Sequence, residues 1–180
     1  IPKYLLNSYR RLISSLRESG VEKEHIIFVC FDDAGSSSAT TLNILRDEAH
    51  LENQEFHLVD ARDLDKLSSL TFSLGDGVLV YVDDFIGSGK QLTGNMSFVR
   101  KHLQGNFAES VLAICICEEA AGKLEELGVT MASEICHRIQ ERPLHENCSL
   151  FLPKEKSRLI NLCSKVAPPC GLGMLKMATM

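Results

Sequence analysis

Short apolar runs alternate with amphipathic stretches along most of this chain. Five runs predict buried strands, namely Ile26–Phe31, Phe56–Asp60, Val78–Val82, Ser110–Cys117 and Val129–Cys136. Between them, apolar residues recur every three or four positions, as on the inward face of helices that cover a sheet. Because strand and helix alternate, we expect an α/β fold with three layers, in which a mainly parallel central sheet carries helices on both faces.

Two of these strands lead into loops of small and acidic residues, and each loop precedes a predicted helix. Asp83 and Asp84 follow Val78–Val82 directly, and a Gly-Ser-Gly turn comes next at Gly87–Gly89. The first strand is followed in the same way by small residues, namely Gly35, Ser36 and Ser37. Backbone N–H groups in such loops and the positive end of the helix dipole favour an anion. Since ligands of parallel sheets bind at the carboxyl ends of the strands, we expect both loops to border one cleft.

Two other motifs share letters with the second loop but do not fit it. A P-loop needs a glycine five residues before its Gly-Lys pair and a serine or threonine after it, where this chain has Asp84 and Gln91. The letters Tyr81–Asp84 match the Tyr-x-Asp-Asp hairpin of reverse transcriptases, in which a second strand must follow. Residues 87–103 predict a loop and a helix instead, so we reject this motif as well.

The run Val78–Leu92 resembles the motif with which type I phosphoribosyltransferases bind phosphoribosyl diphosphate (PRPP). That motif consists of an apolar strand, two acids, two apolar residues and a small loop with Ser or Thr before Gly. Val82–Gly89 is also similar to the Asp-Asp-Phe-x-Gly-(Ser/Thr)-Gly sequence of bacterial phosphoribosyltransferase-like proteins of conflict and antiviral systems. The resemblance implies a phosphoribosyltransferase type I-like fold and a protein that binds PRPP or a related phosphoribose or nucleotide.

The resemblance also implies a role for each polar residue of the two loops. Asp83 and Asp84 are the candidate catalytic residues. They would bind the ribose hydroxyls, hold Mg²⁺ as the cofactor, and stabilise the positive charge that grows on the ribose ring as pyrophosphate leaves. The pyrophosphate would lie against Gly35, Ser36 and Ser37. The 5′-phosphate would bind the loop formed by Gly87, Ser88, Gly89, Lys90 and Gln91.

Two positions depart from the purine-salvage members of that family. Gly87 stands where they have an aspartate that assists proton transfer on the purine, and Gln91 replaces a threonine that helps to hold the phosphate. The function therefore stays open between two classes. Either the chain is an enzyme that transfers a phosphoribosyl group to an acceptor which the sequence does not identify, or it is a non-catalytic module. Such a module would sense PRPP or a nucleotide in a bacterial defence system.

The amino-acid composition bears on the number of domains, the partners and the location of the protein. Its 180 residues suit a single domain, 1–180, and the start at Ile1 leads us to expect an excerpt of a longer chain. A net charge of −5 without a lysine or arginine block argues against a nucleic-acid partner, and no apolar run reaches the length of a membrane span. Cys30, Cys115 and Cys117 lie in apolar runs, as reduced thiols do, so we expect a cytoplasmic protein. A homo-oligomer, a partner protein and a fused domain all stay open.

Overall fold

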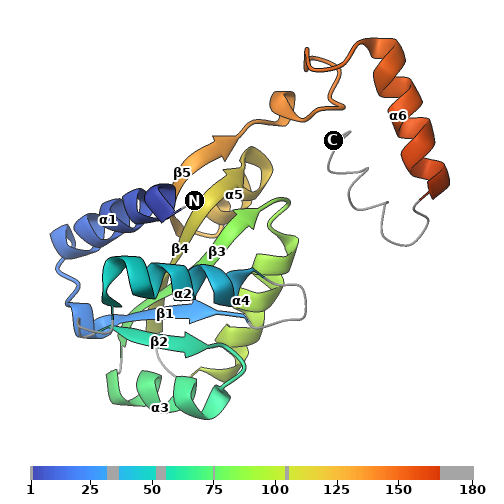
Figure 1. Ribbon diagram of the computed structural model, residues 1–180. Helices are drawn as coiled ribbons and strands as arrows, with labels where there is room; N and C mark the ends of the chain where they lie inside the picture. The colour runs from blue at the N-terminus through green and yellow to red at the C-terminus, as the bar shows by residue number, and fades with distance from the viewer. Residues whose placement is uncertain (1, 32–36, 52–55, 75, 104–105, 167–180) are drawn as a thin grey trace.

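The computed structural model describes residues 2–31, 37–51, 56–74, 76–103 and 106–166. In this part of the chain, five parallel strands form one sheet in the order β2-β1-β3-β4-β5 (Figure 1). This confirms the parallel sheet that the alternating pattern predicts. The strands are β1 (Ile26–Cys30), β2 (His57–Asp60), β3 (Asp76–Ile86), β4 (Asn106–Cys117) and β5 (Thr130–His137).

Helices cover both faces of the sheet, which confirms the three-layer prediction (Figure 1). One face is covered by α1 (Pro2–Glu18) and α2 (Ser38–Ala49). The other face is covered by α3 (Leu64–Leu74), α4 (Lys90–His102) and α5 (Glu118–Glu126). Short 3-10 helices precede β1 and follow β5, namely η1 (Lys23–His25) and η3 (Ile139–Glu141).

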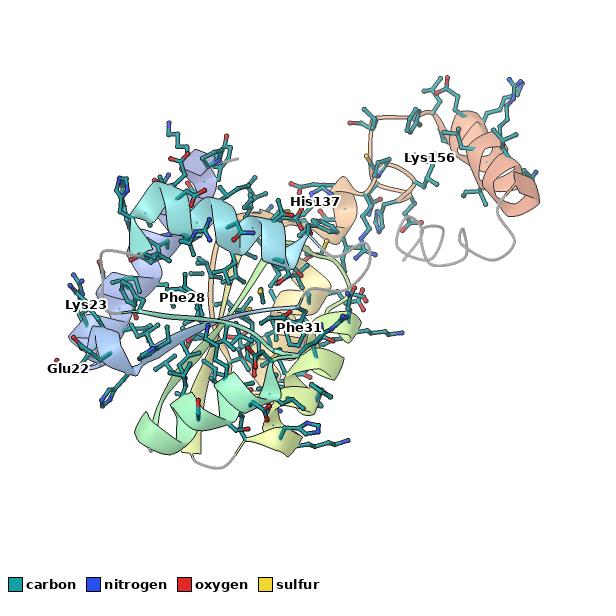
Figure 2. All side chains as sticks on the ribbon, turned by 60° about the horizontal axis from the view of Figure 1, so that its bottom comes forward. Glu22, Lys23, Phe28, Phe31, His137 and Lys156 are labelled. Carbon is teal, nitrogen blue, oxygen red and sulfur yellow. The ribbon has the colours of Figure 1, made fainter. Side chains whose placement is uncertain are left out.

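Side chains of the strands alternate between two hydrophobic cores, one on each face. Every residue of β1 is buried, as expected for a strand with helices on both sides. Phe28 points toward α1 and α2 and packs edge-on against Phe56 with ring centroids 5.5 Å apart. Phe31, just after β1, belongs to the opposite core and stacks on Tyr81 (Figure 2). The sheet is thereby packed between helices on both sides.

The chain changes direction across the sheet between β1 and β3. From β1 it crosses through α2 to β2 on one side, and β3 then returns to the other side of β1. The helices that follow these two strands leave to opposite faces, since α2 packs on one face and α4 on the other. The carboxyl ends of β1 and β3 therefore mark the point where the strand order reverses, and ligands of open α/β sheets commonly bind there.

The end of β3 differs from the sequence-based prediction. We expected the strand to finish at Val82 and the acidic pair to follow it, but β3 runs on to Ile86 and includes Asp83 and Asp84. The reason is the length of β4, which pairs with β3 as far as Ile86 and Ile116. By contrast, the pairing of β1 with β3 ends at Tyr81. The acidic pair thus lies inside a strand, yet beyond the last residue of the neighbouring β1.

The last helix, α6 (Pro153–Val166), stands away from the sheet (Figure 1). Its buried Lys156 reaches back to the preceding loop and donates to the carbonyl oxygens of His145 at 2.5 Å, Glu146 at 3.0 Å and Cys148 at 2.5 Å (Figure 2). Within the described ranges, no helix combines the length and apolar character needed to cross a membrane.

Candidate functional site

Asp83 and Asp84 form the centre of the site, and a residue from the other loop contacts both. The hydroxyl of Ser37 donates to Oδ1 of Asp84 in a short hydrogen bond and lies 3.4 Å from Oδ1 of Asp83. The backbone N–H of Asp84 donates to Oδ1 of Asp83 at 2.9 Å. Ser37 is the N-cap residue of α2, but its side chain makes no capping bond to that helix. Its hydroxyl instead joins the loop after β1 to the acidic pair.

Ser38, the next residue, holds the loop after β1 close to the end of β3. It is 3% exposed, its hydroxyl accepts from the N–H of Phe31 at 3.2 Å, and it donates to the carbonyl of Val82 at 2.6 Å. One side chain thus ties the ends of β1 and β3 to the start of α2. Sequence reasoning did not single out Ser38, because a serine before a helix is ordinarily a cap. Only the tertiary contact with Val82 reveals the difference.

The electrostatics of the pair favour a cation. Burial, reinforced by the neighbouring charge of Asp84, raises the pKa of Asp83 to about 6. Among the described residues, no lysine or arginine forms an ion pair with either carboxylate. Two adjacent, half-buried carboxylates without a positive partner repel each other, so a metal ion or a developing positive charge between them would relieve the repulsion.

The loop after β3 has the backbone geometry of an anion site. Residues 87–89 form a bend, and α4 begins at Lys90. Lys90 and Gln91, in the first turn of this helix, are exposed. Gly89 has φ +72°, and a Cβ there would stand 3.2 Å from Cβ of Ala120 in α5. Both facts require glycine. The N–H of Lys90 lies 3.5 Å from Oγ of Ser88, and Gly89 has no side chain to cap α4, so the N–H groups of Gln91 and Leu92 are the ones in the first turn that a ligand could meet.

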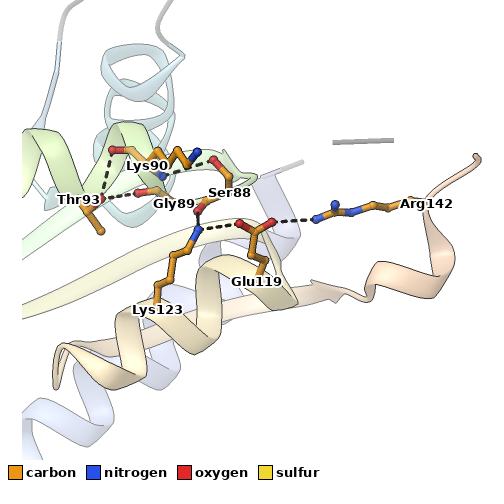
Figure 3. A network of polar contacts seen from close by, with 7 residues as sticks. All are labelled: Ser88, Gly89, Lys90, Thr93, Glu119, Lys123 and Arg142. Carbon is orange, nitrogen blue, oxygen red and sulfur yellow. Dashed lines mark hydrogen bonds and ion pairs between the residues drawn. The ribbon is translucent and has the colours of Figure 1, made fainter. Parts of the chain in front are cut away.

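A chain of polar contacts links this loop to α5 and to the segment after β5 (Figure 3). Nζ of Lys123 donates to the carbonyl of Ser88 at 2.8 Å and to Oε1 of Glu119 at 2.6 Å. The other oxygen of Glu119 lies 3.5 Å from Nη2 of Arg142, which is 5% exposed. Sequence reasoning missed these residues. Their four-residue spacing on a helix indicates the pair Glu119–Lys123, but nothing in the sequence indicates its contact with Ser88.

Gly35 and Ser36, which the resemblance assigns to pyrophosphate, lie outside the described residues. Ser37, the third member of that group, lies against the acidic pair. Ser37 therefore lies near the carboxyl end of β3, the strand that leads into the predicted phosphate loop. No group of three or more metal-binding side chains occurs in the described ranges. The donor set of the pair suits Mg²⁺, which takes one or two carboxylates and completes its shell with water and substrate phosphates.

Comparison with known proteins adds one finding. The family model described as PRTase-CE matches residues 3–174, a range that includes the whole sheet and both loops. A search of curated proteins finds no match.

Proposed function

This chain belongs to the PRTase-CE family, a phosphoribosyltransferase-like family, and on that basis we propose that it binds PRPP or a related phosphoribose or nucleotide together with Mg²⁺. The observation that carries the proposal is the contact of Ser37 with Asp83 and Asp84. This contact joins the loop after β1 to the acidic pair at the position where the chain reverses across the sheet. A ligand with a phosphate at one end and a charged leaving group at the other suits such a position.

Each part of the ligand has a chemical counterpart in the site. The ribose hydroxyls would donate to the carboxylates of Asp83 and Asp84, which also have the oxygen ligands that Mg²⁺ prefers. The 5′-phosphate would accept from N–H groups of the bend at residues 87–89 and of the first turn of α4, where the helix dipole is positive. The hydroxyl of Ser37 is close enough to the carboxylates to meet the leaving-group side of the same ligand.

The same arrangement supports transfer of the phosphoribosyl group. The bond between the ribose carbon and pyrophosphate would break with its electron pair leaving on pyrophosphate, and a lone pair of the acceptor would form the new bond. The carboxylates of Asp83 and Asp84 would stabilise the positive charge that develops on the ring between these events. Mg²⁺, when bound, would neutralise charge on the departing pyrophosphate.

A non-catalytic sensor in a bacterial conflict or antiviral system is the second candidate. Gly87 favours it, because a residue without a side chain supplies no base to take a proton from the acceptor. The sensor would use the same pocket to bind PRPP or a nucleotide and would act through a partner protein or a fused domain. The thiols of Cys115 and Cys117 form no disulfide, which supports a cytoplasmic location for either candidate.

Calorimetric titration with Mg–PRPP tests the binding proposal. The double variant Asp83→Asn, Asp84→Asn should bind about tenfold more weakly or worse, because each charge-assisted hydrogen bond contributes roughly 1.5–3 kcal/mol. The variant Glu125→Gln, Glu126→Gln removes two exposed carboxylates of α5 and should bind like the wild type. No binding by the wild type, or equal binding by the Asp83/Asp84 variant, would contradict the proposal.

Pyrophosphate release separates the two candidates. The protein would be incubated with PRPP and Mg²⁺ in the presence of a panel of nucleobases and amines. Release that depends on one acceptor and is lost in the Asp83/Asp84 variant identifies a transferase. Tight binding of PRPP without release in any mixture favours the sensor.

A further inference from the structure

The predicted phosphate loop is held in place by a residue of α5. Lys123 donates from Nζ to the carbonyl oxygen of Ser88 at 2.8 Å (Figure 3). Ala120, one turn earlier on α5, packs under Gly89, where an added Cβ would come within 3.2 Å. The first turns of α5 therefore support the bend at two adjacent points, one polar and one apolar.

The contact with Ser88 controls the direction of the next N–H group. The carbonyl of Ser88 and the N–H of Gly89 belong to one planar peptide unit, and in a trans peptide they point in opposite directions. No cis peptide bond occurs in the described part of the chain. An ammonium group that holds the carbonyl on the side of α5 thus turns the N–H of Gly89 away from α5. The positive charge also polarises the peptide unit and makes this N–H a stronger donor.

Lys123 is itself held in one position. Its Nζ lies 2.6 Å from Oε1 of Glu119, one turn earlier on α5. Glu119 is in turn 3.5 Å from the buried guanidinium of Arg142. These contacts lower the pKa of Glu119, chiefly through the hydrogen bond from Lys123. The charge nearest to the loop is the ammonium group of Lys123, which contacts the carbonyl of Ser88 directly and favours an anion on the other side of this peptide unit.

From this geometry we infer that Lys123 is a positioning residue for the phosphate of the ligand. It orients and polarises the N–H of Gly89 toward the 5′-phosphate without touching the ligand, and Glu119 keeps it in place. The inference rests on the proposed function and deepens it, because it assigns the phosphomonoester end of the ligand to the loop that Lys123 supports. The affinity of ligands without this phosphate should not depend on Lys123.

Titrations with two probes test the inference. Ribose 5-phosphate carries the phosphomonoester alone, and Mg–pyrophosphate carries only the leaving group. The variant Lys123→Met should bind ribose 5-phosphate about tenfold more weakly than the wild type and bind Mg–pyrophosphate equally well. Lys123→Arg restores a charged donor and should recover most of the affinity. Lys101→Met removes an exposed lysine from the last turn of α4 and should change neither affinity.

Equal affinity of wild type and Lys123→Met for ribose 5-phosphate would overturn this inference and leave the proposed function standing. A parallel loss for both probes would also overturn it, because it would indicate a general structural role. Failure of the wild type to bind ribose 5-phosphate and PRPP at all would overturn the proposed function and this inference together.

An NMR measurement tests the inference even if Lys123→Met folds poorly. Hydrogen bonding to phosphate moves an amide proton downfield, so the amide signal of Gly89 should shift downfield when ribose 5-phosphate is added to the wild type. The milder variant Glu119→Gln, which loosens Lys123 without removing it, should reduce this shift. Binding of ribose 5-phosphate without any shift at Gly89 would overturn the inference.

Discussion

At the scale of single residues, Asp83 shows a conflict between stability and binding. Its carboxyl lies partly out of water beside a second carboxyl, and both effects raise its pKa, to about 6. A group in this state destabilises the folded protein whenever it is ionised. An ion or ligand that neutralises the pair removes this cost, which is why strained carboxylates are common at binding sites.

The pH dependence of stability should reveal this conflict. The pKa of Asp83 is about 6 in the folded protein, against an ordinary value of 3.8 for an aspartate in water. Between these values the folded state binds more protons than the unfolded state, so the free energy of unfolding falls as pH rises through this range. Asp83→Asn lacks this loss and should melt at a higher temperature than the wild type near pH 7.5. Melting curves recorded without ligand between about pH 4 and pH 8 should show the advantage shrinking toward pH 4.

If Asp83→Asn melts at a lower temperature than the wild type at neutral pH, the carboxylate makes a stabilising contact whose free energy exceeds the cost of its burial. The proposed role of the pair as a cation site would then lose its electrostatic basis.

Ser37→Ala tests the contact between the two loops. The change leaves Oδ1 of Asp84 without the hydroxyl that donates to it. Because the carboxylate is partly exposed, water replaces some of this bond, and we expect a loss of about 1 kcal/mol in the free energy of unfolding. Urea denaturation measures it. Thr40→Ala removes an exposed hydroxyl from the same helix and serves as the control. Equal stabilities of the two variants would show that the contact contributes nothing.

At the scale of elements, the sequence predicts where strands and helices lie better than where they end. Apolar runs located all five strands, because burial between two helical layers demands apolar side chains. Both ends of β3 and the start of β4 were missed because backbone pairing does not require apolar residues, whereas the end of β4 at Cys117 was predicted correctly. The polar Glu109 is accommodated in β4 because it accepts from the hydroxyl of Tyr81 at 2.9 Å and forms an ion pair with Arg100. Such contacts depend on the tertiary structure.

In the candidate site, too, the sequence predicts local motifs and does not predict tertiary contacts. Asp83, Asp84 and the glycine loop were recognised because they are contiguous in sequence. Ser38 and Lys123 were missed because their contacts with Val82 and Ser88 join residues 35 or more positions apart. Glu119 was missed because its role depends on the contact of Lys123 with Ser88 and on the distant Arg142. A local pattern carries no information about such contacts.

Gly89→Ala should damage the loop between β3 and α4. An alanine at φ +72° is strained, and its Cβ would press on Ala120 at 3.2 Å. We expect a loss of about 1–3 kcal/mol in the free energy of unfolding. Gly94 provides a matched control inside α4, because an added Cβ meets nothing within 4 Å. Gly94→Ala should stabilise the protein by about 0.5–1 kcal/mol. Urea denaturation of both variants checks the opposite signs, and a stable Gly89→Ala would mean that the loop tolerates another conformation.

At the scale of the whole molecule, the described chain divides into a packed α/β body and a projecting helix. Both hydrophobic cores consist of residues between Leu5 and Ala132. The helix α6 is anchored through Lys156 to its own preceding loop. The stability of the body should therefore not depend on α6.

Truncation tests this division. A chain that ends at Ser149 lacks α6 and keeps both cores, so its melting temperature should stay within a few degrees of the full chain. A chain that lacks residues 1–19 loses the five buried apolar residues of α1, namely Leu5, Tyr9, Leu12, Ile13 and Leu16. Each contributes about 1.5–3 kcal/mol, so this second truncation should prevent folding. Cooperative melting of the second chain, or collapse of the first, would contradict the division.

The packing of α1 also has a consequence for how the nascent chain reaches its native state. This early helix lies over the last two strands of the sheet, and Arg11 donates to the carbonyl of Ser133, 122 positions later, at 2.7 Å. About 120 residues separate the end of α1 from the end of β5. At ribosomal speeds of about 5–20 residues per second, roughly 6–24 s pass between their synthesis. During that interval α1 can pack on β1 and α2, but the part of its apolar stripe that contacts β4 and β5 stays uncovered, so the emerging polypeptide presents a binding site for chaperones.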